Sequence, residues 1–374
     1  IALPAIPPIA KSFDVSFGLA SLIISVFLLG GVVGSLPNGF LIDRFGHRKV
    51  VLAGPLITCA LALLVLTAQS FPQLLVYRFF DGWAAQMWLM GRVAGLSARA
   101  ASAQRGRQVT WMLSMDGAGR LFGPLVGGIV AGVWGIRSPF AAYALLAFLA
   151  VIPSFFFLKE SARPTRAASD EPRLSWLAMI KQLVLPQLPF FGVAFFSAVA
   201  RGPIYSGLMH LYAAFTYNLD AEGIGILATA SGVLSVPVSF FAGYSLDRFG
   251  RRPTLIPAFL GITATMVALT ITAVLHLSLA WYVAVYMAGS AVQNLAGGST
   301  QTLGADIAPA AARGKFLGVW QLCNLSGNSS SPLLFALLAD KTGYPSSFIF
   351  IACAALIVAL LLITKVPETR GRNY

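Results

Sequence analysis

The sequence is poor in charge, because only 10% of its 374 residues are Asp, Glu, Lys or Arg, whereas 57% are hydrophobic. Soluble domains carry roughly 25% charged residues, and so apolar a chain has too little polar surface to face water. Cysteine is also scarce: Cys59, Cys323 and Cys353 lie inside apolar runs, so no disulfide framework is expected. Zinc-ligand spacings, phosphate loops and nucleophile elbows are absent. We therefore expect no enzyme, catalytic residue, metal or cofactor.

Long apolar runs recur along the chain and reach the ~20 residues that a helix needs to cross a bilayer core. Inside hydrocarbon the backbone must satisfy its own hydrogen bonds, and these runs are too long for the strands of a barrel. The sequence thus predicts an all-α polytopic membrane protein. The eleven helices expected are 17–42, 49–68, 73–97, 108–133, 138–158, 187–215, 222–246, 254–275, 279–303, 314–338 and 346–365.

A ten-residue stretch occurs twice: Gly39–Arg48 reads GFLIDRFGHR and Gly243–Arg252 reads GYSLDRFGRR. Asp247 follows Asp43 by 204 residues. The pair Gly123-Pro124 recurs as Ser331-Pro332 at an offset of 208. This spacing indicates two duplicated halves, as many transporters have. Six helices separate the two copies, so both lie on one side of the membrane.

The duplication also predicts the domains. We expect residues 1–158 to hold a remnant of a first helix and helices 2–6, residues 159–186 to be a cytoplasmic linker, and residues 187–374 to hold helices 7–12 and a short tail. The alignment of the halves implies that most of helix 1 is missing and that the intact protein has twelve helices.

Basic residues set the orientation. The segments expected on the same side as the two Asp-Arg copies hold nineteen Lys and Arg residues, whereas the opposite loops hold three; those segments are 43–49, 99–107, 159–181, 248–252, 313–315 and 365–372. Positive residues favour the cytoplasmic side. We expect a multi-pass protein of the plasma (inner) membrane with a cytoplasmic C-terminus.

The stretch Gly39–Lys49 resembles the G-x-L-x-D-R-x-G-x-R-K signature between helices 2 and 3 of the major facilitator superfamily. That resemblance implies two pseudo-symmetric six-helix bundles, alternating access, and a cytoplasmic lock that opens as the bundles rock. Gly39 and Gly243 should permit close helix packing, and Gly46 and Gly250 tight reversals; the alternative is that the loop only anchors a turn. The lock residues would be Gly39, Asp43, Arg44, Gly46, Arg48, Asp247, Arg248, Gly250 and Arg252.

A second motif lies in the fifth helix and is similar to G-x-x-x-G-P-x-x-G-G of drug:proton antiporters. The resemblance implies proton-coupled efflux of small hydrophobic or amphipathic compounds. Proline bends a helix and glycines smooth its face, so a hinge is expected, with ordinary tight packing as the alternative. The motif consists of Gly119, Gly123, Pro124, Gly127 and Gly128.

Charged residues inside the predicted helices are candidates for proton coupling, since such charges are expensive unless they pair or function. Arg78 and Asp81 are spaced i, i+3, and Asp116 and Arg120 i, i+4, so each pair can meet on one helix face. Arg78–Gly82 resembles the R-x-x-x-G motif, whose Arg is implicated in proton transfer. Either pair could instead be structural.

Arg201 has no acidic residue near it in its own helix, so we expect it to contact substrate unless it pairs with Asp116 or an acid of helix 1. Other polar residues would complete a substrate site or serve as interhelical glue; they are Tyr205, Gln293, Asn294, Gln321 and Asn324. Aromatic walls would come from Trp111, Tyr286 and Trp320.

Two other functions stay open. One is proton-linked uptake or exchange of an organic anion or a sugar. An anion is favoured because the predicted helices contain four Arg against two acids, and a sugar because the tail Pro367–Gly371 resembles that of sugar porters. The other is a membrane sensor that keeps the fold without transport. The expected partners are a small-molecule substrate, protons and the lipid bilayer, with no nucleic acid, a monomeric state and the proton gradient as energy source.

Overall fold

The computed structural model describes residues 1–99, 102–158, 185–297, 299–308 and 313–369, and the described chain is almost wholly helical. Eight of the described helices are long and apolar enough to cross a membrane. Of the others, α1, α9, α12 and α13 are shorter than 18 residues, whereas α4 is long but contains Arg78, Asp81 and Arg92. The multi-pass helical architecture predicted from the sequence is confirmed.

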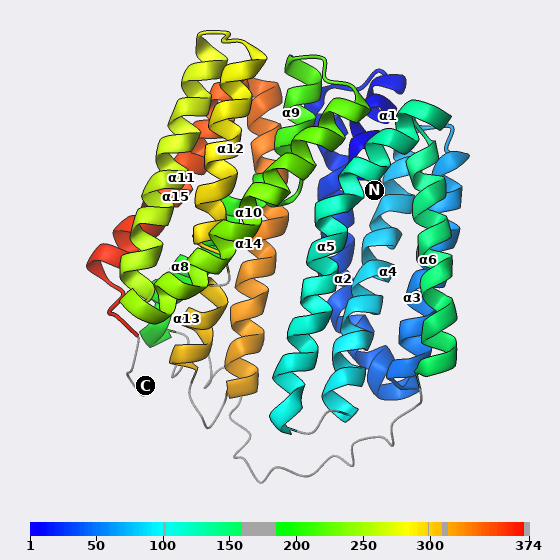
Figure 1. Cartoon of the computed structure of the whole chain (residues 1–374), viewed down its shortest axis with the longest axis horizontal. Helices are drawn as coiled ribbons and strands as arrows, with labels where there is room; N and C mark the ends of the chain where they lie inside the picture. The colour runs from blue at the N-terminus through cyan, green and yellow to red at the C-terminus, as the bar shows by residue number, and fades with distance from the viewer. Residues whose placement is uncertain (100–101, 159–184, 298, 309–312, 370–374) are drawn as a thin grey trace. The chain divides into compact units, whose positions relative to one another are not determined.

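The chain forms two compact units, of which the first comprises Ile1–Ala168 and His210–Thr229. Its long helices run side by side in Figure 1. α2 and α3 both pack against α4, and α3 also packs against α6, while α5 contacts the N-terminal turn. The elements are η1 (Leu3–Ala5), α1 (Ile6–Ser12), α2 (Phe17–Phe45), α3 (His47–Leu66), α4 (Phe71–Arg99), α5 (Ser102–Trp134) and α6 (Ser138–Phe157).

The second unit comprises Ser169–Met209 and Ala230–Tyr374. In it α11 packs against α12 and α15, and α8 packs against α14 and α15. The linker expected at 159–186 lies almost wholly outside the described residues, so the domain boundaries stay a prediction. The remaining elements of the chain are η3 (Leu185–Gln187), α8 (Leu188–Tyr205), α9 (Leu208–Thr216), α10 (Ala221–Phe249), α11 (Arg251–Val274), α12 (Leu279–Leu295), α13 (Ser299–Ile307), α14 (Arg313–Thr342) and α15 (Tyr344–Thr364).

The same pattern of helix contacts occurs inside each of the two units. α3 contacts α4 and α6 in the first, and α11 contacts α12 and α15 in the second. The repeated loops also share a contact: an Nη2 nitrogen of Arg48 donates to the Phe155 carbonyl at 3.2 Å, and that of Arg252 donates to the Ile363 carbonyl at 2.9 Å. Each arginine therefore ties its loop to the last helix of its own half, as a duplication predicts.

Two predicted helices are interrupted. The helix expected at 187–215 consists of α8 and α9, with Gly207 between them at a φ of 84°, a conformation that favours glycine. The helix expected at 279–303 consists of α12 and α13. Discontinuous helices in transporters commonly lie at binding sites, because they leave backbone polar groups free.

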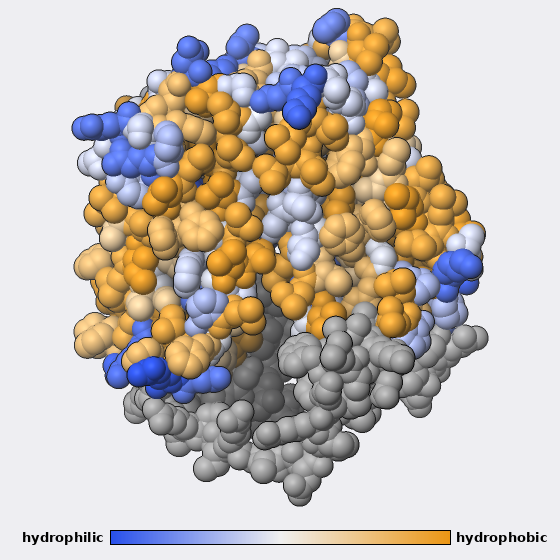
Figure 2. All heavy atoms as spheres, turned by 180° about the vertical axis from the view of Figure 1, so that it is seen from behind, coloured by the Kyte–Doolittle hydropathy of each residue, from blue (hydrophilic) through white to orange (hydrophobic). Residues whose placement is uncertain are grey.

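The surface carries many large apolar side chains. Phe156, Leu146, Phe240 and Leu360 are each at least 48% exposed. On the face shown in Figure 2, apolar side chains cover the middle of the helices and hydrophilic ones gather near their ends. Exposed apolar patches of this extent fit contact with lipid.

Candidate functional site

A buried ion pair lies inside the first unit, on α4. The Arg78 Nη1 atom is 2.5 Å from Asp81 Oδ2, and the side chains are 8% and 3% exposed. The guanidinium also stands over the Phe27 ring of α2, at 4.4 Å from its centroid. The pairing expected from the i, i+3 spacing is present, and the two charges neutralise each other away from solvent.

Two further side chains complete this cluster, and neither was predicted from the sequence. The Tyr143 hydroxyl of α6 donates to Asp81 Oδ1 at 3.3 Å. Thr58 of α3, which is 5% exposed, lies beside both Asp81 and Tyr143. Asp81 is thus held by Arg78 of its own helix and by Tyr143 of α6.

Asp116 has a different partner from the one expected. Arg92 of α4 donates to its Oδ1 from both terminal nitrogens at 3.2 Å and to its Oδ2 at 3.0 Å. Arg92 also lies over the Trp88 ring, at 4.0 Å from the centroid. The expected pair of Asp116 with Arg120 is therefore wrong, because a guanidinium arriving from the neighbouring helix fits the carboxylate with two nitrogens at once.

Arg120 is exposed on α5 and forms no ion pair with any residue that the structure describes. Beside it, a side chain added at Gly117 or Gly119 would meet nothing within 4 Å. The face of α5 around Arg120 is open within the described structure.

Arg201 lies in the second unit, in the last turns of α8. Its Nη2 atom donates to the Tyr205 hydroxyl at 3.2 Å, and the guanidinium lies over the Tyr205 ring at 4.9 Å. Tyr205 is 53% exposed. No acidic partner of Arg201 occurs among the described residues of its own unit, and Asp116, in the first unit, is held by Arg92.

The polar residues expected to bind substrate divide into packed and open ones. Gln293 is 3% exposed, and Asn294 donates to the Ser235 hydroxyl of α10 at 2.7 Å. Asn324 donates to the carbonyl of Trp320, one turn earlier in α14, whereas Gln321 is exposed. Asn294 therefore joins α12 to α10, whereas Gln293 is buried within the second unit.

The expected aromatic walls are mostly closed. Tyr286 is 3% and Trp320 2% exposed, so both contribute to packing in the second unit. Trp111 lies in a stretch whose side chains are outside the described part of the chain. Among these aromatic candidates, Tyr205 keeps an open face.

The two Asp-Arg loops turn as expected but pack differently. Gly46 and Gly250 have φ values of 85° and 102°, so only glycine fits these reversals readily. In contrast, a Cβ at Gly39 or Gly243 would meet nothing within 4 Å. The close helix approach expected at Gly39 and Gly243 therefore stays a prediction.

The aspartates of these loops, Asp43 and Asp247, are exposed together with Arg44 and Arg248. The start of α11 is capped by Glu368 of the C-terminal tail, which accepts hydrogen bonds from the backbone N–H groups of Arg251 and Arg252 at 2.9 Å. Capping of an N-terminus by a carboxylate is favourable. The sequence did not reveal this tail contact.

The glycine motif of α5 packs closely at three of its four glycines. A Cβ at Gly127 would lie 2.0 Å from the Ile1 carbonyl oxygen, one at Gly128 2.7 Å from the Ala221 oxygen, and one at Gly123 3.1 Å from the Ile1 nitrogen. Gly119 has open space. The helix continues through Pro124, and the Thr229 hydroxyl of α10 donates to the Leu121 carbonyl just before it, at 3.2 Å.

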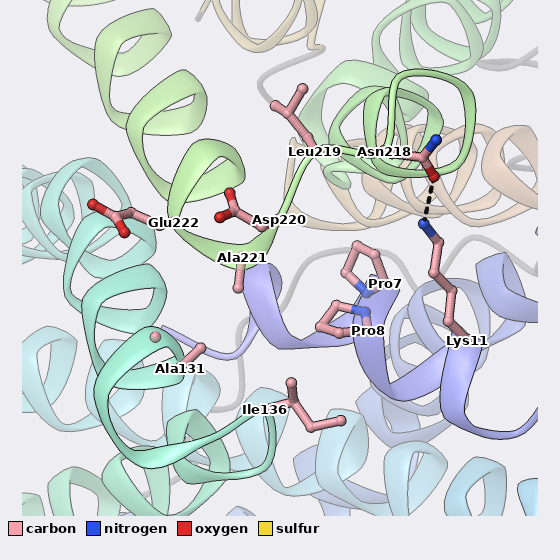
Figure 3. Close-up of a pocket in the computed structure, with 11 residues that line it drawn as sticks. Pro7, Pro8, Lys11, Ala131, Ile136, Asn218, Leu219, Asp220, Ala221 and Glu222 are labelled. Carbon is pink, nitrogen blue, oxygen red and sulfur yellow. Dashed lines mark hydrogen bonds between the residues drawn. The ribbon is translucent and has the colours of Figure 1, made fainter.

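A pocket of about 350 Å³ lies near the start of α10 in the first unit (Figure 3). Lys11 Nζ donates to the Ala214 carbonyl at 2.9 Å and to Asn218 Oδ1 at 3.3 Å. Asp220 accepts from the backbone N–H of Gly223 at 2.8 Å. Lys11 and Asp220 are therefore already satisfied within the protein. Among the described residues, no group of three or more His, Cys, Asp or Glu is placed to hold a metal.

Comparison with known families gives a match over the whole chain. The family model described as Major Facilitator Superfamily matches residues 1–292 and 190–373.

Curated relatives point the same way. The quinolone resistance protein NorA of Staphylococcus aureus is 24% identical over 255 residues, which cover 67% of this chain and 62% of NorA. The match therefore spans less than two thirds of NorA's length. An uncharacterised MFS-type transporter of Methanocaldococcus jannaschii is 23% identical over 373 residues, 97% of this chain and 94% of that protein.

Solved structures share the fold. The crystal structure of a D-xylose-proton symporter superposes with a TM-score of 0.82 at 19% identity, over 100% of this chain and 96% of that one. The inward-open xylose transporter XylE from E. coli gives a TM-score of 0.79 at 18% identity, over 100% and 94%. At such identities the likeness concerns the fold alone.

Proposed function

The chain belongs to the major facilitator superfamily, a family of transporters rather than enzymes, and we propose that it exports small amphipathic compounds in exchange for protons. Export would proceed by alternating access, with the proton gradient as the energy source and without a cofactor. We further propose that the protein works as a monomer in the plasma membrane, with its C-terminus in the cytoplasm.

Similarity to a quinolone resistance protein supports export, as does the glycine-proline motif of α5. Quinolones are therefore the first compounds to test. The basic residues of the loops support the orientation.

The observation that carries the proposal is the cluster around Asp81. Asp81 is 2% exposed, lies in α4 within the predicted membrane helix 73–97, pairs with Arg78 and accepts a hydrogen bond from Tyr143. Intramembrane carboxylates of this kind mark proton relays in transporters. Protonation of Asp81 would release Arg78, so a proton could change the contacts that α4 makes. Asp116, held by Arg92, is the second candidate carrier.

Everted membrane vesicles from cells that produce the full chain test the proposal. After a proton gradient is imposed, a fluorescent quinolone should accumulate inside the vesicles, and its addition should release protons from the lumen. Accumulation that persists when the gradient is collapsed would contradict proton coupling. Vesicles without the protein are the control.

Uptake is the second candidate, supported by the excess of Arg over acids within the predicted helices and by the tail Pro367–Gly371. Symport of an organic anion or a sugar would drive substrate out of everted vesicles, opposite to antiport. A sensor would bind substrate in proteoliposomes without any flux. The same vesicle assay therefore separates the three functions.

A further inference from the structure

The charges inside the helices do not balance. Away from the helix ends, the described acids are Asp81, paired with Arg78, and Asp116, paired with Arg92. Arg120 and Arg201 have no acidic partner among the described residues. Arg201 is partly satisfied by the hydroxyl and ring of Tyr205. For Arg120, by contrast, neither a hydrogen bond to a hydroxyl nor a ring contact occurs within the described part of the chain.

Arg120 lies inside the stretch Met115–Trp134 of α5, which is long and apolar enough to cross a membrane. It stands five residues after Met115 and 14 residues before Trp134, about 7.5 and 21 Å along the helix. A cation within such a stretch favours contact with water, an anion or a polar ligand, because contact with lipid is costly.

The surroundings of Arg120 leave room for a ligand. Gly117, three residues before Arg120 and on the same face of the helix, has open space where a side chain would stand. Asp116, one turn away, cannot neutralise Arg120 because its two oxygens are engaged by Arg92. The local charge of Arg92, Asp116 and Arg120 together is +1, which an anionic group of a ligand would cancel.

Resting on the proposed transport function, we infer that this face of α5 binds the carboxylate, or an equivalent single anionic group, of an aromatic or amphipathic substrate, and that Arg120 recognises it. A guanidinium meets a carboxylate with two parallel hydrogen bonds. The open space at Gly117 would accommodate the flat apolar part of the substrate. Substrates would then be acids or zwitterions rather than simple lipophilic cations.

The test compares matched acids and esters on the purified full chain. Binding of a fluorescent quinolone carboxylic acid and its ethyl ester is measured at pH 7, together with two other aromatic acid–ester pairs. Hydrogen bonds to charged groups lead us to expect the acid to bind about 10- to 100-fold more tightly than the ester. Absence of an acid preference in all three pairs, including absence of any binding, overturns the inference.

Variants locate the effect. Arg120→Gln should bring the acid–ester ratio close to one by weakening the acid only, and Arg120→Lys should keep most of the preference. Lys341→Gln removes the same charge from the exposed end of α14 and should leave the ratio unchanged. A ratio preserved in a folded Arg120→Gln protein would place recognition elsewhere and overturn the assignment to Arg120.

The two proposals fail separately. Acid-selective binding without any flux in proteoliposomes would overturn transport and leave recognition by Arg120 standing. Gradient-driven flux of acid and ester at equal rates would overturn the recognition and leave transport standing.

Discussion

Arg92 on α4 donates hydrogen bonds to the carboxylate of Asp116 on α5 from both terminal nitrogens, at 3.0 to 3.2 Å. This pair joins two helices of the first unit and determines which of the neighbouring charges are paired. Asp116 loses its freedom to pair along its own helix, and Arg120 is left without an acid among the described residues.

A double-mutant cycle should show this preference. Arg92→Gln combined with Asp116→Asn should give a coupling energy within about 0.5–3 kcal/mol, as expected for residues of one salt bridge. Arg120→Gln combined with Asp116→Asn should give a coupling near zero. Thermal unfolding of the purified protein measures both, and a larger coupling for the second pair would contradict the structure.

Asp81 and Arg78 should depend on each other for stability. Asp81→Asn or Arg78→Gln alone leaves one buried charge unpaired, which costs about 3–5 kcal/mol. The double variant should recover most of this loss, because neither charge remains. Recovery is checked by thermal unfolding against Asp14→Asn, an exposed site at a φ of 54° where asparagine is well tolerated.

The same double variant tests proton coupling. We predict that it loses accumulation driven by a proton gradient but still exchanges labelled for unlabelled quinolone across the membrane, since exchange needs no net proton movement. Asp14→Asn should retain both. Gradient-driven accumulation at the wild-type level in the double variant would remove this pair from the coupling mechanism.

The glycines of α5 should respond to substitution with opposite signs. Gly128→Ala places a Cβ 2.7 Å from the Ala221 carbonyl oxygen, and overpacking of this kind costs about 1–3 kcal/mol. Gly119→Ala meets nothing and should stabilise the helix by about 0.5–1 kcal/mol. Equal effects of the two changes on the unfolding temperature would show that the motif does not pack as described.

The repeat predicts that the two Asp-Arg loops share one side of the membrane. In a background without Cys59, Cys323 and Cys353, Asp43→Cys and Asp247→Cys should both react with an impermeant thiol reagent added from the cytoplasmic side. Asp14→Cys should react from the opposite side. Labelling of positions 43 and 247 from different sides would refute the parallel duplication.

The sequence alone was sufficient for the helical membrane fold, the duplication and the Arg78–Asp81 pair. Each of these is local: the length of an apolar run fixes whether a helix can span, and i, i+3 spacing fixes which side chains share one face. The reversals at Gly46 and Gly250 are local for the same reason, because a positive φ favours glycine.

Tertiary structure decided which helices meet, and with them the partners of the charges. Tyr143 of α6 donates a hydrogen bond to Asp81, and Asp116 pairs with Arg92 of α4 rather than with Arg120. A Cβ at Gly39 or Gly243 would meet nothing within 4 Å. The interruption at Gly207 also follows from the fold, since the apolar run there reads as one helix. In a membrane nearly every helix is apolar on all sides, so hydropathy does not show which face meets which neighbour; packing and a few polar contacts determine that.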